Sequence, residues 1–115
     1  MIITDYMTIE EIMNLFYEEY GEEFNWHMIP FTNKTYVNEL KKELGKNDNL
    51  VDPNIYSVAK CDSNDDVLFL VGDLWRIYHL TYSTNNMPGY PKYEEFSSRR
   101  EAAEYIRDQY VNDYL

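Results

Sequence analysis

The chain has 115 residues, 44% of them hydrophobic, which is enough for one modest core, so we expect residues 1–115 to form a single domain. Twenty-one acidic and ten basic side chains leave a formal net charge of −11, which argues against binding nucleic acid or an anionic membrane through a basic patch. No apolar run approaches the roughly 18 residues of a membrane span, and the first residues lack the basic stretch of a signal peptide. We therefore expect a cytoplasmic protein, in which the lone Cys61 is a packing residue rather than half of a disulfide.

The first predicted element is an acidic amphipathic helix. Thr8 and Glu11 have the spacing of a capping box, and Gly21 follows the last residue of the apolar stripe, so the helix should run to about Tyr20. No Lys or Arg occurs before Lys34, whereas seven acidic residues do. The solvent face of this helix carries candidate partner-binding carboxylates at Glu11 and Glu18. Glu22 is a third candidate, on the same face if the helix continues for one more turn. The simpler interpretation is that these carboxylates only keep the protein soluble.

Residues 23–31 hold several large apolar side chains and are interrupted by Pro30, which predicts an irregular connection or a short strand. His27 in this segment is interpreted as a hydrogen-bonded packing residue. Thr32 or Asn33 can cap a second helix, which Gly45 ends. Its core positions are Val37, Leu40 and Leu44, and its outer positions are Lys41, Lys42 and Glu43. Residues 46–54 form a polar connection within the same domain.

A strand is predicted over residues 55–61, followed by a polar turn and then a hairpin at the centre of the sheet. Residues 67–71 are apolar at every position, as in a strand covered on both faces. Gly72-Asp73 fits a two-residue type II′ turn, and residues 74–82 form the second arm. The alternation in this arm places Trp75, Ile77 and His79 on one face, which we expect to be buried.

The turn after residue 61 supplies a second acidic patch, with Asp62, Asp65 and Asp66 as candidate partner-binding residues. Asp62, Asn64 and Asp66 imitate the start of a calcium loop. However, Val67 stands where such a loop needs Gly and no Glu follows at its end, so we predict no metal.

Residues 84–91 form a proline-containing loop that carries Met87 and Tyr90 toward solvent or a neighbouring surface. Tyr82 and Tyr90, near this loop, are the tyrosines that we expect at an interface. Residues 92–96 add a fourth strand, and Ser98 with Glu101 forms a capping box that begins the last helix. The predicted fold is α+β: an antiparallel meander of three or four strands with two N-terminal helices and a C-terminal helix packed on it. The first and last helices should share one face.

No catalytic motif accompanies these elements. His79 and Thr81 imitate half of the paired His-x-Thr/Ser arrangement of two-histidine phosphoesterases, but the second half is missing, because Met28 and Ile29 follow His27. The sequence also lacks a glycine-rich phosphate loop, a nucleophile elbow and a zinc-type Cys/His cluster. We therefore expect a protein that is not an enzyme and needs no cofactor.

From Asp66 to Ser83, DVLFLVGDLWRIYHLTYS, and from Tyr90 to Ile106, YPKYEEFSSRREAAEYI, the chain resembles small immunity proteins encoded beside bacterial polymorphic toxins. The shared features are an apolar hairpin with a central Trp, a Pro-containing loop, one more strand ending in Phe and an Ala-rich closing helix. The resemblance covers the C-terminal half. It implies a cognate toxin as partner, commonly a basic nuclease, which the immunity protein inhibits by occlusion.

The charge agrees with this implication, because an acidic surface attracts a cationic partner protein. Two alternatives remain open. A phage-type inhibitor or DNA mimic would also be acidic, although Arg99, Arg100 and Arg107 interrupt the negative field here. The other is a non-catalytic module that forms a homodimer.

Overall fold

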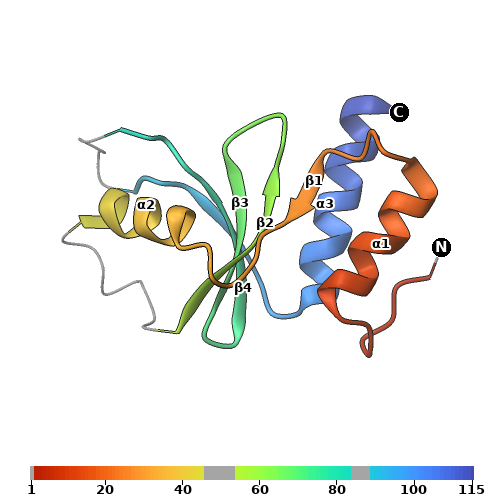
Figure 1. Cartoon of the computed structure of the whole chain (residues 1–115), viewed down its shortest axis with the longest axis horizontal. Helices are drawn as coiled ribbons and strands as arrows, with labels where there is room; N and C mark the ends of the chain where they lie inside the picture. The colour runs from red at the N-terminus through yellow and green to blue at the C-terminus, as the bar shows by residue number, and fades with distance from the viewer. Residues whose placement is uncertain (1, 46–53, 84–88) are drawn as a thin grey trace.

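In the computed structural model, which describes residues 2–45, 54–83 and 89–115, three helices flank one open antiparallel sheet of five strands (Figure 1). The elements in chain order are α1 (Ile9–Tyr20), β1 (Trp26–Met28), α2 (Thr35–Leu44), β2 (Ile55–Cys61), β3 (Asp66–Val71), β4 (Leu74–His79), β5 (Tyr93–Phe96) and α3 (Arg99–Tyr114). The order of the strands across the sheet follows the chain, which confirms the predicted α+β meander. The sheet has five strands and not the expected three or four, because the short segment β1 pairs with β2.

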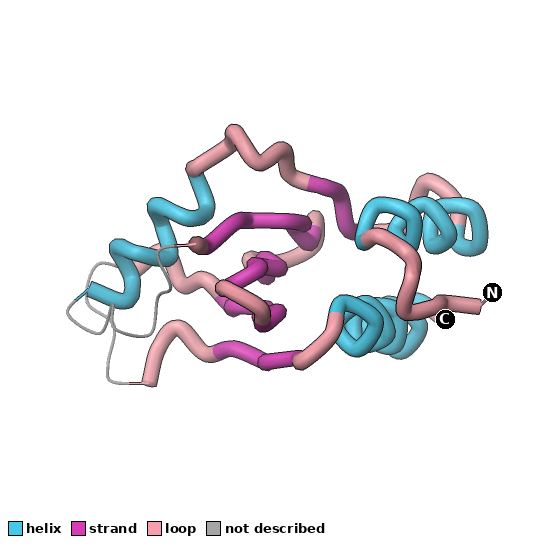
Figure 2. Tube along the Cα trace, turned by 90° about the horizontal axis from the view of Figure 1, so that it is seen from below, coloured by secondary structure: helices cyan, strands magenta, loops and turns pink. Residues whose placement is uncertain are grey.

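The molecule has three layers, with α2 on one face of the sheet and α1 and α3 on the other (Figure 2). The first and last helices therefore share a face, as the sequence predicts. On that face Leu68 and Ile77 pack against Ile12, Phe16 and Ile106. On the opposite face Phe69 and Tyr78 pack against the apolar side of α2, formed by Val37, Leu40 and Leu44.

The central position of β3 explains its continuous apolar run. Leu68 contributes to the core under α1 and α3, while Val67, Phe69 and Val71 contribute to the core under α2. The side chains of Val67, Leu68 and Phe69 are all 0% exposed, so a polar residue at any of these positions would be buried.

The turns follow the sequence closely. Gly72 and Asp73 connect β3 to β4, and Gly72 has a φ of 61° while Asp73 has no positive φ, the combination that a type II′ turn needs. Gly21 and Gly45 stand at the C-terminal ends of α1 and α2. The predicted connection over residues 46–54 lies outside the described residues, apart from Asn54.

Helix starts are capped by side chains in α1 and α3. Thr8 Oγ1 accepts the Glu11 N–H at 3.1 Å, and Glu11 Oε1 accepts the Thr8 N–H at 3.0 Å, which completes the predicted capping box. Ser98 Oγ accepts the Glu101 N–H at 3.2 Å, but the Glu101 carboxylate bonds to Ser97 instead of returning to Ser98. The cap position of α2 is Lys34, while Asn33 Oδ1 accepts the Thr35 N–H at 3.0 Å.

Candidate functional site

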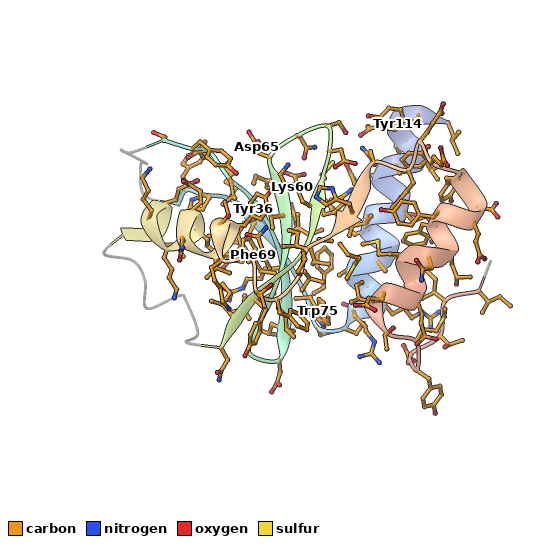
Figure 3. The ribbon with its side chains drawn as sticks, viewed as in Figure 1. Tyr36, Lys60, Asp65, Phe69, Trp75 and Tyr114 are labelled. Atoms are coloured by element: carbon orange, nitrogen blue, oxygen red, sulfur yellow. The ribbon has the colours of Figure 1, made fainter. Side chains whose placement is uncertain are left out.

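Three segments meet at one end of the molecule: the C-terminal ends of α1 and α3, and the β2–β3 turn at residues 62–65 (Figure 1). The rings of Tyr20 and Tyr110 lie 5.0 Å apart, which joins the two helices. The Tyr114 hydroxyl donates to Ser63 Oγ at 3.1 Å, which joins α3 to the turn. Figure 3 shows Asp65 and Tyr114 at this same upper end.

This end of the molecule is densely acidic. We call it the acidic end and define it by Glu18, Glu19, Glu22, Glu23, Asp62, Asp65, Asp66 and Asp113. All of these residues are exposed except Asp66, which is half-buried. Five of them, Glu18, Glu22, Asp62, Asp65 and Asp66, are predicted from the sequence as partner-binding residues. Asp113 is not, because residue spacing along α3 does not tell which end of the molecule its last turn reaches.

The helix dipoles add to the negative field there. Neither α1 nor α3 has a basic residue in its last turn, although the C-terminal end of a helix carries a partial negative charge that a cation would neutralise. Lys60 lies nearby, but its Nζ donates to the backbone carbonyls of Cys61 and Asn64 and so stabilises the turn.

Two of the turn carboxylates are paired with histidines. His27 Nδ1 lies 2.5 Å from Asp62 Oδ1, and His79 Nδ1 lies 2.5 Å from Asp66 Oδ1. The interpretation of His27 as hydrogen-bonded is confirmed, although its side chain is 50% exposed and is not a packing residue. The expectation that His79 is buried is wrong, since 37% of its side chain is exposed. His27 pairs across the sheet with Lys60, and His79 with Asp66, so that the two imidazoles lie on opposite faces of the sheet. They cannot flank one phosphate.

Glu11 does not belong to the acidic end. It lies in the first turn of α1, at the opposite end of that helix, where its carboxylate serves the capping box. The hydrogen bond from the Thr8 N–H lowers the pKa of Glu11, helped by the Thr8 hydroxyl and the positive charge of Arg99. Glu22 lies at the acidic end but beyond the helix, because α1 ends before Gly21.

Tyr82 lies on the α2 side of the molecule and is 49% exposed, with a φ of 54°. Its position is fixed by a residue that the sequence analysis placed on the outside of α2. Glu43 is 6% exposed; its Oε1 accepts the Thr81 N–H and hydroxyl, both at 2.8 Å, and its Oε2 accepts the Tyr82 N–H at 3.0 Å. The prediction that Glu43 faces solvent is wrong, because this carboxylate is buried and is hydrogen-bonded to the backbone N–H groups of Thr81 and Tyr82.

Tyr90 is 38% exposed, and Lys92 Nζ lies 5.3 Å from the centre of its ring. Tyr90 lies three residues before β5, the strand at the opposite edge of the sheet from β1. Met87, the other residue expected at a surface in this loop, lies outside the described residues.

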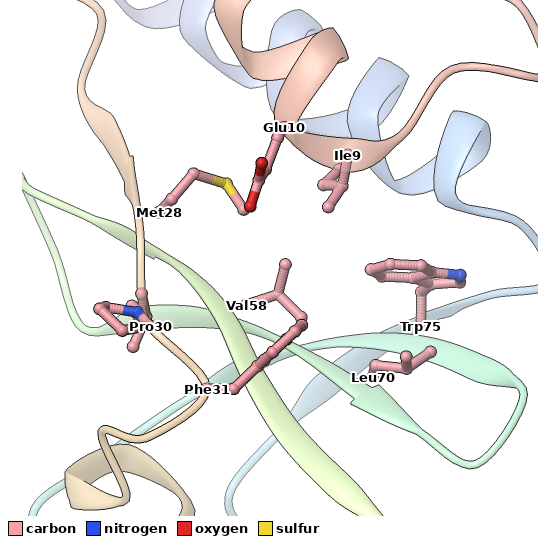
Figure 4. Close-up of a pocket in the computed structure, with 9 residues that line it drawn as sticks. Ile9, Glu10, Met28, Pro30, Phe31, Val58, Leu70 and Trp75 are labelled. Atoms are coloured by element: carbon pink, nitrogen blue, oxygen red, sulfur yellow. The ribbon is translucent and has the colours of Figure 1, made fainter.

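A second surface feature lies under the N-terminal end of α1, where the sheet is not covered (Figure 4). It is an apolar groove of about 430 Å³, which we call the α1 groove. Its lining residues are Ile9, Glu10, Met28, Ile29, Pro30, Phe31, Val58, Leu70 and Trp75. The prediction that the whole face with Trp75 is buried is therefore only partly correct: Ile77 is fully buried, whereas Trp75 is half-buried and lines the groove.

Comparisons of the chain with known protein families, with curated proteins and with solved structures give no match. Among the described residues, no three His, Cys, Asp or Glu side chains are grouped so that they could hold a metal ion. In the same part of the chain, no helix has both the length and the apolar character of a membrane span. The arrangement is suited to binding a cationic protein surface at the acidic end, with an apolar groove at the other end of α1.

Proposed function

We propose that this protein binds and neutralises a cognate toxin protein, in the manner of the immunity proteins that its C-terminal half resembles. The observation that carries the proposal is the acidic end, where carboxylates from three segments surround two helix ends of the same sign. A basic nuclease presents positive charge at the site that holds nucleic acid. An acidic surface opposite that site would accelerate association and block access to the substrate.

The acidic end is unfavourable for the isolated protein. A carboxylate in the last turn of a helix interacts unfavourably with the helix dipole, by about 0.3–1 kcal/mol at an exposed site. Glu18 and Glu19 occupy that turn of α1, and Asp113 occupies it in α3. A basic partner would compensate this unfavourable charge on binding. The charge placement therefore suits a complex better than it suits the free protein.

The chain should act by occlusion and not by catalysis. Each histidine has a carboxylate partner, and the two histidines lie on opposite faces of the sheet, so they do not form a joint site. Glu43, a buried carboxylate, is engaged with the backbone after β4. These polar groups have structural partners, which supports a binding role.

The test is charge reversal at exposed carboxylates of the acidic end. Asp62 and Asp66 are unsuitable because each is paired with a histidine, so we choose Glu18→Lys, Glu22→Lys and Asp65→Lys together. The toxin to use is the one encoded beside this gene, produced in the same cells. We expect the triple variant to fold and to lose neutralisation of that toxin, with a lower association rate in vitro.

The control is Asp73→Lys, which changes the charge by as much as each single reversal of the triple variant, in the exposed β3–β4 turn at the other end of the sheet, and which is compared with Asp65→Lys alone as well as with the triple variant. It should retain neutralisation. Full protection by the triple variant, or no binding of the adjacent toxin by the wild-type protein, would refute the proposed function.

A further inference from the structure

The α1 groove exists because α1 covers the sheet only from its second turn onward. Ile12, Met13 and Phe16 are at most 1% exposed, whereas Ile9 is half-buried and Glu10 is exposed. Figure 4 shows Ile9 and Glu10 above the groove and Val58, Leu70 and Trp75 on the sheet below it. Apolar side chains on both sides of the groove thus remain open to water.

The lining has a simple chemical pattern. Eight of the nine residues are apolar, and the ninth is Glu10, whose carboxylate lies on the Met28 side of the opening (Figure 4). Phe31 at the rim is 67% exposed, which is unusual for so large an apolar side chain. A volume of about 430 Å³ lies within the range of about 300–1,000 Å³ that is typical of ligand pockets.

We propose that the α1 groove receives an apolar side chain of the partner protein, and that Glu10 pairs with a Lys or Arg beside that side chain. The proposal rests on the proposed function, because it assigns a second contact to the same basic partner. Trp75 forms the wall against which the apolar side chain packs, and it can also face a cation. The groove supplies the anchor contact that an electrostatic surface alone lacks.

The outer face of α1 connects the groove to the acidic end. Exposed carboxylates of α1 lie near both ends of the helix, at Glu10 and at Glu18, and α1 contains no Lys or Arg. Its 12 residues span about 18 Å, a distance that one side of an ordinary interface covers. A single basic surface could therefore contact the acidic end while one of its apolar side chains enters the groove.

Charge favours a different, basic protein over a second copy of this chain as the occupant. Two copies would each bring a net charge of −11 to the contact, and the carboxylate in the groove would meet a mostly acidic surface. A partner segment with an apolar residue between cations matches both the apolar lining and Glu10.

Three end-blocked tripeptides test the proposal without knowledge of the toxin: a leucine between two lysines, a serine between two lysines, and a leucine between two glutamates. Binding is followed by quenching of tryptophan fluorescence with acrylamide. Trp26 is 5% exposed and already shielded, so a change in quenching reports on Trp75. We expect the lysine-flanked leucine peptide to protect Trp75, and the serine peptide to bind at least about tenfold more weakly.

Two variants of the protein complete the test. Glu10→Gln should reduce the affinity for the lysine-flanked leucine peptide about two- to fivefold, as expected for loss of a partly exposed ion pair. It should not reduce the affinity for the glutamate-flanked peptide. Ile9→Phe should reduce binding of every leucine peptide by filling the groove with no change of charge. Equal binding of the serine peptide, or no effect of Glu10→Gln, would overturn the proposal. Protection of Trp75 that rises with protein concentration and accompanies dimer formation would also overturn it, since the occupant would then be a second copy.

The outcomes for the groove and for the proposed function are separable. If peptide binding depends on Glu10 but the protein neutralises no toxin, the groove is a site for basic-apolar segments and the immunity role is wrong. If Glu10→Gln and Ile9→Phe both leave toxin neutralisation and the association rate unchanged, the immunity role is supported and the groove is not a contact for the toxin.

Discussion

At the scale of single residues, the carboxylates of Glu39 and Glu43 on α2 form a pair whose protonation should affect the stability of the protein. The hydrogen bond with Glu43 raises the pKa of Glu39, and burial of Glu39 and the negative charge of Glu43 add to the rise. Burial also acts to raise the pKa of Glu43, but hydrogen bonds from Glu39, Thr81 and Tyr82 lower it overall. When the pair holds one proton, that proton therefore lies on Glu39.

This proton makes the stability of α2 depend on pH. A group whose pKa is raised by folding stabilises the protein fully below its unfolded pKa of about 4.5, and that contribution is lost as the pH rises through the folded value. Above the folded value both carboxylates are charged, and one turn of helix separates them. Like charges at this spacing cost about 0.2–0.5 kcal/mol even on an exposed helix.

Replacing Glu39 with glutamine should therefore stabilise the protein at pH 7. The amide introduced by Glu39→Gln would donate to Glu43 at every pH, so the gain over wild type should shrink as the pH falls toward 4. Urea unfolding at several pH values measures the difference. Glu23→Gln, at an exposed residue outside the helices, corrects for the loss of one negative charge. A gain that is the same at pH 4 and pH 7 would show that the two carboxyl groups do not share a proton.

At the scale of elements, α1 shows how charge placement for binding opposes charge placement for stability. Glu10 and Glu11 in its first turn suit the helix dipole, whereas Glu18 and Glu19 in its last turn oppose it. The helix is held by its apolar face, on which Ile12, Met13 and Phe16 are buried, and not by its surface charges.

Glu18→Lys should accordingly raise the stability of the free protein by about 0.3–1 kcal/mol, because it places a cation at the negative end of α1. Glu10→Lys, at the other end of the same helix, should lower stability by a similar amount. Thermal unfolding at low salt compares the two variants with wild type. Changes of the same sign in both would mean that net charge, and not position in the helix, decides the effect.

The sequence predicts best those elements in which a single hydrophobic periodicity or a local turn motif dominates. The apolar stripe and capping box of α1, and the hairpin around Gly72, are local patterns, and the structure confirms them. β1 is harder to predict, since three residues are too few to distinguish a short strand from an irregular connection, and only the pairing with β2 decides between them. The role of Glu43 was also hidden, because its donors lie far away in the chain and spacing within α2 cannot indicate them.

At the scale of the whole molecule, the net charge of −11 and the location of the acidic end should govern how the protein meets its partner. The Debye length falls from about 30 Å at about 0.01 M salt to about 3 Å at about 1 M, so exposed charges lose their range. If the proposed toxin is the partner, its association should therefore slow toward the value of about 10⁵–10⁶ M⁻¹s⁻¹ for uncharged pairs as salt rises.

Stopped-flow or surface-binding measurements over this salt range give the association rate, and the dissociation rate from the same traces serves as the internal control. Dissociation should change less than association, because contacts such as the apolar α1 groove are not screened. An association rate that does not depend on salt would show that the acidic end does not guide the encounter.

The packing of α1 beside α3 also constrains how the chain acquires its fold. The two helices run in the same direction, and the whole sheet lies between them in the sequence (Figure 1). Ile12 and Phe16 share a core with Ala103 and Ile106, so the apolar face of α1 is completely covered only after α3 has been synthesised. Such distant contacts form slowly, and until they form, part of this apolar face can stick to other unfolded chains.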